Sequence, residues 1–144
     1  MKRTYALLVW LIGLASYVMN PVWAQDTTPS KPTSRVVEDG GTGPFKAIMV
    51  SEASLPTHTV FRPSDVKTAT KKGKLPIIVW GNGACANSPW EHVNFLSEVA
   101  SYGFMVIAIG PMPQEGERTR DRSTSSQMTD AINWAIGQNG DKGS

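Results

Sequence analysis

The sequence predicts an α/β fold, a class in which strands and helices alternate along the chain. Two continuous apolar runs, residues 75–80 (LPIIVW) and 104–109 (FMVIAI), have the length of strands that are buried on both faces. A segment with helix start and stop signals separates them. Strand, helix and strand with short connections form a βαβ unit, whose strands run parallel. We therefore expect a parallel sheet with flanking helices, preceded by an N-terminal antiparallel strand pair.

The antiparallel pair is expected at residues 45–50 (FKAIMV) and 58–62 (HTVFR). Both runs are short and rich in β-branched or aromatic residues, and Leu55-Pro56 interrupts the chain between them. Pro63 closes the second run, which we interpret as a strand near the edge of the sheet. Lys71–Lys74 supplies a turn before the first apolar run.

The helix between the two apolar runs has a clear start. Ser88-Pro89-Trp90-Glu91 is a capping box, with Ser88 as the N-cap and Pro89 at the first helical position. Gly103 is a natural C-terminal stop. One face of this helix carries apolar side chains, namely Val93, Leu96 and Ala100, with Phe95 and Val99 beside them.

A second helix is predicted after Thr124, which forms a capping pair with Gln127. Its apolar side chains recur with helical spacing and predict the face that packs on the sheet. Such a helix should lead into a third parallel strand, and a sheet without that strand would leave an apolar edge uncovered. We therefore expect the sequence to be a fragment of a longer protein. The apolar positions are Met128, Ala131, Ile132, Ala135 and Ile136.

The first 24 residues have the pattern of a secretory signal peptide. Met1-Lys2-Arg3 is basic, Tyr5–Val18 is apolar, and Ala24 is the small residue expected before cleavage. The uncharged stretch is shorter than the roughly 20 residues that a membrane-spanning helix needs, so no stable membrane anchor is expected. Residues 25–43 are predicted to be a flexible linker, because they hold little apolar surface to bury. Residues 44–144 would then be the folded part of a secreted or periplasmic protein.

The charge balance argues against nucleic acid as a partner. The formal net charge of +2 equals the charge of Lys2 and Arg3, which the signal peptide would remove. A basic stripe is the usual footprint of a nucleic-acid binder. Lys71–Lys74 lacks aromatic neighbours, and Arg118–Arg122 is interleaved with acidic residues. Both segments are interpreted as solvated loops.

The loop Gly81–Ala86 (GNGACA) is the segment most suggestive of function, and it matches the letters of a dinucleotide-binding motif. That function requires a helix that opens within the motif and an acidic residue near the end of the next strand. Here the capping box places the helix start after the motif, at Ser88. The next strand ends at Ile109-Gly110-Pro111, without a carboxylate. A dinucleotide enzyme is therefore disfavoured, and titration with NAD would test it.

A glycine-rich loop after a central strand can instead direct backbone N–H groups at one point, where they stabilise the oxyanion of an acyl-transfer intermediate. The segment LPIIVWGNGACANSPWEHVNFLSEVASYGFMVIAIG, residues 75–110, resembles the third strand, oxyanion loop, first helix and fourth strand of the α/β-hydrolase superfamily. It is most similar to secreted polyester hydrolases, cutinase-like esterases and dienelactone-hydrolase-like members. Tyr102-Gly103-Phe104 matches a turn of these proteins, and the resemblance spans about residues 46–137.

The resemblance implies an exported serine hydrolase acting on small-molecule or polymeric carboxylic esters, without a cofactor. The oxyanion donor would be a backbone N–H of Asn82, Gly83 or Ala84. Members of the family usually have His-Gly or Pro-Gly at the loop entrance, where this chain has Trp80-Gly81, and the register of the donors stays open. None of the 13 serines lies in a G-x-S-x-G elbow. No catalytic side chain is therefore expected in this chain, and the fragment alone should be inactive.

The remaining reactive side chains do not form a site. His58 and His92 have no acid–serine pair placed to serve them, and we interpret them as surface or packing residues. Together with Cys85 they match no structural zinc spacing, so no metal is expected. Cys85 is either a small buried residue or the partner of a cysteine elsewhere in the longer protein.

The alternative to the hydrolase hypothesis is a complete small secreted binding domain without chemistry. It predicts that the mature chain is a monomer that unfolds cooperatively, whereas the fragment hypothesis predicts poor solubility or a molten state. Thermal melts and light scattering separate the two.

Overall fold

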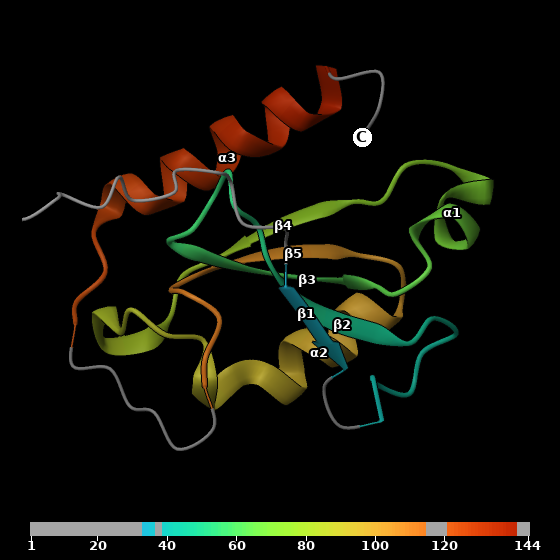
Figure 1. Ribbon diagram of the computed structural model, residues 1–144, viewed down its shortest axis with the longest axis horizontal. Coiled ribbons are helices and arrows are strands. Elements are labelled where there is room, and N and C mark those ends of the chain that lie inside the picture. The colour runs from blue at the N-terminus through green and yellow to red at the C-terminus, as the bar shows by residue number, and fades with distance from the viewer. Residues whose placement is uncertain (1–32, 37–38, 115–120, 141–144) are drawn as a thin grey trace, which may run out of the picture.

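The computed structural model describes residues 33–36, 39–114 and 121–140, and these form a single mixed sheet with helices on both faces (Figure 1). The predicted signal peptide, residues 1–24, lies outside the described residues. The strands are β1 (Thr33–Val36), β2 (Ala47–Ser51), β3 (His58–Pro63), β4 (Ile77–Trp80) and β5 (Met105–Ile109). The α-helices are α1 (Val66–Ala69), α2 (Val93–Ser101) and α3 (Ser125–Gly140), with 3₁₀ turns at Thr70–Lys72, Gly83–Cys85 and Trp90–His92.

The strands lie in the order β1-β2-β3-β5-β4. β1, β2, β3 and β5 are joined by antiparallel pairing, whereas β4 and β5 run parallel. The α/β class, the N-terminal antiparallel pair and the βαβ unit are thus confirmed. The expectation that residues 58–62 form a strand near the edge is wrong, because β3 lies between β2 and β5. Pro63 is tolerated there since it is the last residue of the strand.

β4 lies at the end of the strand order, which corrects its interpretation as a strand buried on both faces. Among the described strands it pairs with β5 alone. Ile77 is 46% exposed, and the following three residues of the strand are half-buried. The apolar run reflects side chains that face α2 and α3, whereas one backbone edge of the strand has no described neighbour. An apolar run predicts that the side chains on both faces of a strand are buried, but it does not predict whether each backbone edge of the strand pairs with another strand.

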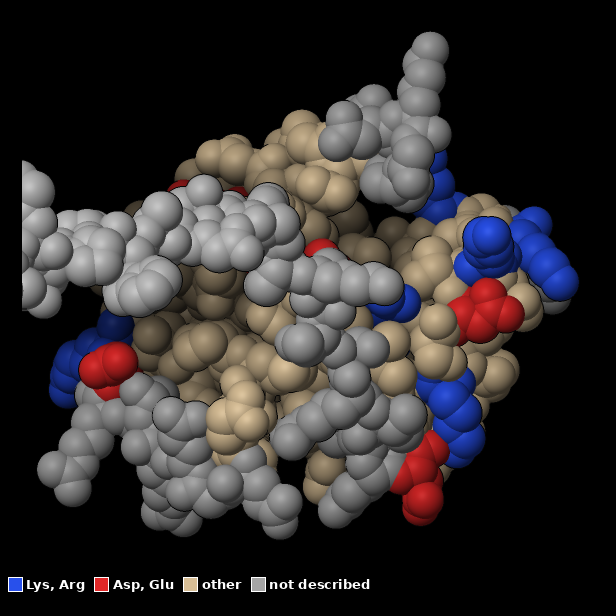
Figure 2. Space-filling model, viewed as in Figure 1, with Lys and Arg blue, Asp and Glu red and all other residues tan. Residues whose placement is uncertain are grey.

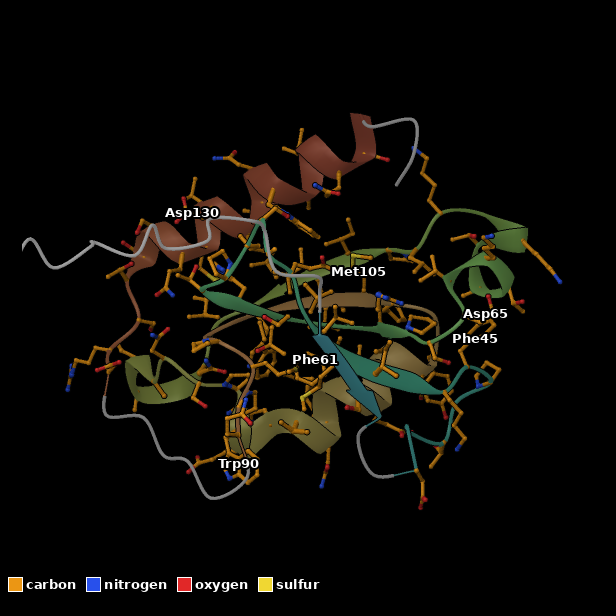
Figure 3. All side chains as sticks on the ribbon, viewed as in Figure 1. Phe45, Phe61, Asp65, Trp90, Met105 and Asp130 are labelled. Atoms are coloured by element: carbon orange, nitrogen blue, oxygen red, sulfur yellow. The ribbon has the colours of Figure 1, made fainter. Side chains whose placement is uncertain are left out.

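The two faces of the sheet are covered by different helices, α2 on one side and α3 on the other (Figure 1). Alternation along the strands divides the core between these faces. Phe61 points to the α2 side and Met105 to the α3 side (Figure 3). The buried core on the α2 side contains Ala47, Met49, Phe61, Val93, Leu96, Ala100, Val106 and Ala108, and that on the α3 side contains Val50, Leu55, Val60, Ile107, Ala131 and Ala135.

The α-helix α2 begins at Val93, later than the capping box predicts. Residues 90–92 form a 3₁₀ turn first, and its Trp90 N–H donates to Ser88 Oγ at 3.3 Å. The N-cap position of this turn is Pro89, and Ser88 lies one residue before it, so the predicted placement of Ser88 at the N-cap and Pro89 inside the helix is wrong by one residue. A 3₁₀ turn is a common way for a helix to begin. The predicted apolar face and the stop at Gly103, which has φ +91°, are confirmed.

α3 packs with a different face from the one predicted. Ala131 and Ala135 are buried as expected, but Ile132 and Ile136 are 48% and 66% exposed. The helix instead turns Gln127 and Trp134 toward the sheet. The predicted helical period of 3.6 residues is correct. The predicted apolar face is rotated about the helix axis relative to the observed one, because the two large isoleucines indicate a face that the structure leaves exposed.

Part of the predicted linker belongs to the fold. Residues 33–36 form β1, which pairs antiparallel with β2. A Cβ added at Gly43 would come within 2.3 Å of the main-chain oxygen of Ser101, so this segment lies directly against the end of α2. Backbone hydrogen bonds to β2 hold residues 33–36 in place, and amino-acid composition cannot predict such pairing. None of the helices in the described ranges is long and apolar enough to cross a membrane.

Charged side chains of both signs lie at the two ends of the face shown in Figure 2. Lys74 Nζ donates to Asn139 Oδ1 at 2.9 Å, which joins the approach to β4 to the last turn of α3.

Candidate functional site

The loop Gly81–Ala86 follows β4 at the carboxyl end of the parallel strand pair, the usual place for ligand sites in α/β sheets. The segment that leads into α3 lies beside it. Asn87 N donates to Asp121 O at 3.1 Å, and Ser123 N donates to Cys85 O at 2.9 Å. A β-bridge between Ala86 and Arg122 completes this pairing. The second half of the loop is therefore held by hydrogen bonds to a distant part of the chain.

The backbone of the loop adopts an uncommon conformation. Ala84 (φ 53°, ψ 25°) and Cys85 (φ 55°) are the two non-glycine residues with positive φ among those described. Left-handed conformations at non-glycine residues cost on the order of 1–3 kcal/mol each and persist where surrounding structure imposes them. Two in succession turn the chain sharply at this point.

Three backbone N–H groups of the loop are uncommitted. Ala86 N donates to Gly83 O at 3.1 Å, but no hydrogen bond found among the described residues uses the N–H of Asn82, Gly83 or Ala84. Gly83 and Ala84 are exposed, and a Cβ added at Gly83 would meet nothing within 4 Å. In the described part of the chain, the three candidate donors thus lie in one turn, with Asn82 half-buried, and none of their N–H groups is engaged.

The side chain of Asn82 closes the loop on itself. Its Nδ2 donates to Ala86 O at 2.9 Å and to Ile109 O at 2.8 Å, the latter at the end of β5. Its Oδ1 is buried and has no hydrogen-bond partner among the described residues. The sequence points only to the backbone of Asn82, because no local pattern shows that its side-chain amide reaches the neighbouring strand.

Gly110 allows the two strand ends to approach. It has φ +106°, and a Cβ added there would come within 2.7 Å of the backbone of Asn87 and Ser88. Only glycine permits this contact. Thr59 Oγ1 donates to Gly110 O at 2.9 Å and so fixes the peptide from the β3 side.

A buried polar network joins the loop to the first turn of α3. Gln127 Nε2 donates to Asn87 Oδ1 at 3.0 Å, and Gln127 Oε1 accepts from Thr124 N at 2.8 Å. The predicted pairing of Thr124 with Gln127 is therefore present. His58, fully buried, has its Nε2 2.9 Å from Gln127 O and its Nδ1 3.0 Å from Thr57 Oγ1. Of the two roles expected for His58, at the surface or in packing, the structure shows packing.

His92 lies on the opposite side of the sheet from this network. Its ring meets the Trp80 indole edge-on with centroids 5.4 Å apart, and Phe95 contacts the same indole at 5.5 Å. Trp80 Nε1 is buried without a partner. His92 therefore packs on the strand that leads into the loop and does not face the uncommitted N–H groups.

Cys85 is exposed and unpaired, so it is not a small buried residue. The described residues contain no group of three or more His, Cys, Asp or Glu side chains placed to bind a metal ion.

A hollow of about 480 Å³ lies away from the loop, between the 39–46 segment and α2. Thr42 donates from its backbone N–H to Glu98 Oε2 at 2.8 Å and from its hydroxyl to Glu98 Oε1. These hydrogen bonds, and more weakly the charge of Lys46, lower the pKa of Glu98. The carboxylate is therefore engaged in joining the two segments.

Comparison with models of known protein families finds none that matches this chain, and comparison with curated proteins also finds no match.

Proposed function

We propose that this chain is the N-terminal part of an exported serine hydrolase of the α/β-hydrolase type, acting on carboxylic esters. The observation that carries the proposal is the turn at Asn82, Gly83 and Ala84 at the carboxyl end of β4, whose backbone N–H groups are not used by any hydrogen bond within the described residues. The mixed sheet supports it, because an antiparallel pair followed by a βαβ unit is the architecture that the resemblance implies.

The proposed role of the turn is to stabilise negative charge. When an activated serine attacks an ester carbonyl, the carbonyl oxygen becomes an oxyanion, and preorganised N–H donors lower the energy of that intermediate. Loss of one such donor typically costs about 10²–10³ in kcat. The turn is preorganised here because hydrogen bonds from Asn82, Asn87 and Ser123 fix the backbone on both sides of it.

The nucleophile, its acid and its histidine would be supplied by sequence beyond Ser144, since no serine in the chain stands in a G-x-S-x-G elbow. His58 is not available as the general base, because its Nε2 is engaged by a main-chain carbonyl and its ring is fully buried.

The experiment is to express the reading frame extended past Ser144 and to measure hydrolysis of p-nitrophenyl esters together with labelling by a fluorophosphonate, which reacts with activated serines. We expect both activities in the extended protein and neither in residues 25–144. An extended frame that encodes no serine elbow, or a protein that neither hydrolyses esters nor takes up the label, would overturn the proposal.

A further inference from the structure

We propose that the side-chain amide of Asn82 is the positioning residue of this loop. It fixes the backbone of residues 83–85 and so sets the direction of the uncommitted N–H groups. The inference rests on the proposed function for the purpose of those groups, whereas the role of Asn82 in the conformation of the loop can be tested without it.

The geometry of the amide leaves one orientation. Both hydrogens of Nδ2 are used, since the acceptors Ala86 O and Ile109 O lie 2.9 and 2.8 Å away. An amide rotated by 180° would place Oδ1 against two carbonyl oxygens and lose both hydrogen bonds. The assignment of nitrogen and oxygen is therefore determined by the two carbonyls.

This orientation has a cost that points to a specific role. Oδ1 is buried and has no partner in the described part of the chain, and an unpaired buried acceptor is unfavourable. A residue kept for stability alone would be expected to satisfy both ends of the amide. The two hydrogen bonds donated by Nδ2 fix the orientation of the Asn82 amide, and Oδ1 is left without a donor among the described residues.

The other described contacts of the loop act on parts of it. Ala86 N donates to Gly83 O at 3.1 Å and closes the turn itself. The pairing with the 121–123 segment holds Cys85 O and Asn87 N, which lie in the second half of the loop. Gly83 meets no packing atoms where a side chain would be, and Ala84 is exposed. Among the described contacts, the Asn82 amide alone spans the turn from its first residue to Ala86 and also ties it to the end of β5. We therefore infer that it helps to hold the left-handed conformations of Ala84 and Cys85.

The test compares N82D with wild type by ¹H–¹⁵N NMR of the full chain, with N133A as the matched control because Asn133 is exposed on α3. N82D keeps the shape of the side chain but replaces both donors by a carboxylate oxygen. We expect the amide resonances and φ-dependent couplings of Ala84 and Cys85 to change at pH 7, while those of β3 and β5 stay in place. N133A should leave all of them unchanged.

Acidification supplies a readout that a merely structural contact would not give. Once the introduced carboxyl is protonated, its O–H can donate to one of the two carbonyls, so the loop resonances of N82D should return part of the way toward wild type. Should N82D not fold, N82A decides, because it removes the donors without adding a charge. Wild-type resonances and couplings for Ala84 and Cys85 in the variant would overturn the proposal.

In the extended protein, N82A should lower kcat for p-nitrophenyl acetate by about tenfold or more while KM changes little, as expected for a group that acts on the transition state. A wild-type protein without ester hydrolysis, combined with shifted loop resonances in the variant, would reject the proposed function and support the role of Asn82. Unchanged kcat in an active N82A protein would overturn the positioning role.

Discussion

The imidazole Nε2 of His58 lies 2.9 Å from the main-chain oxygen of Gln127, so the first residue of β3 is tied to the first turn of α3. Because a carbonyl oxygen can only accept, Nε2 donates to it, and Nδ1 lies 3.0 Å from the hydroxyl oxygen Thr57 Oγ1. Both ring nitrogens are thus satisfied inside the protein. The contact joins a central strand that begins at His58 to a helix that begins at Ser125, 67 residues later.

Replacing His58 by alanine should lower the free energy of unfolding by about 3 kcal/mol. The change leaves a cavity in a fully buried site and removes the partner of Gln127 O. Guanidinium denaturation followed by circular dichroism measures the loss. The matched control is H92A, whose ring is half-buried and makes an edge-on contact with Trp80, and which should cost about 1 kcal/mol or less. Equal losses in the two variants would contradict this account.

Gly110→Ala should be among the most damaging single changes in the chain. The added methyl would lie 2.7 Å from backbone atoms of Asn87 and Ser88, and φ +106° is unfavourable for alanine. We expect a loss of at least about 2 kcal/mol in thermal or chemical denaturation.

Gly137→Ala is the counterpart within α3. Nothing lies within 4 Å of the position that its Cβ would take, and alanine is favoured over glycine in a helix by about 1 kcal/mol. The melting temperature should therefore rise for G137A and fall for G110A. A rise in both would show that the contact at Gly110 is not tight.

Ala84→Gly should stabilise the protein slightly or leave it unchanged, because glycine adopts φ 53° without the strain that alanine carries. Ala86→Gly is the opposite case. Ala86 has φ −66° and ψ 131°, so glycine there only adds conformational freedom to the unfolded chain and should cost about 0.5–1 kcal/mol. Urea denaturation of the two variants side by side checks the difference, and a larger loss for A84G would refute the left-handed assignment.

Stability should fall in acid through Glu98. Hydrogen bonds from Thr42 lower its pKa in the folded protein below the ordinary value of 4.5. A depressed folded pKa contributes stability that is fully present above the unfolded pKa and is lost as the pH falls through the folded one. Melting temperatures measured from pH 7 to pH 3 should therefore depend less on pH in E98Q than in wild type.

Thr42→Val provides the reciprocal variant, because it removes the hydroxyl that donates to Glu98 Oε1 while keeping the shape of the side chain. It should flatten the same part of the pH profile, and adding E98Q to it should bring little further change. Independent and additive effects of the two variants would argue against their coupling.

Sequence predicted those features that depend on spacing along the chain. The core face of α2 and the buried strand β5 follow from periodicity and apolar runs, and both were located correctly. The central position of β3, the open edge of β4 and the pairing of β1 depend on which strands meet in space. Nothing in residues 58–62 or 77–80 alone encodes the neighbours that they acquire.

The same division applies to the candidate site. The glycine-rich loop after the strand indicates where a ligand could bind, and the resemblance to α/β-hydrolases implies a backbone donor at Asn82, Gly83 or Ala84. The amide of Asn82 reaches Ile109 across 27 positions of the sequence, and Gly110 is required by the backbone of Asn87. Such contacts between distant segments cannot be read from a motif.

The strand order also constrains how the chain folds. β2 and β3 are close in sequence and can pair as a hairpin, whereas the pairing of β3 with β5 closes a long loop, with Thr59 and Gly110 51 positions apart. Closing long loops slows folding. β4 precedes β5 in the chain but, among the described strands, attaches to the sheet through β5 alone. The pairing of β4 with β5 joins residues only 28 positions apart, as Ile77 and Met105 show, so it closes a shorter loop than the pairing of β3 with β5. By the same argument we expect the parallel pair, and with it the turn that follows β4, to form no later than the pairing of β3 with β5.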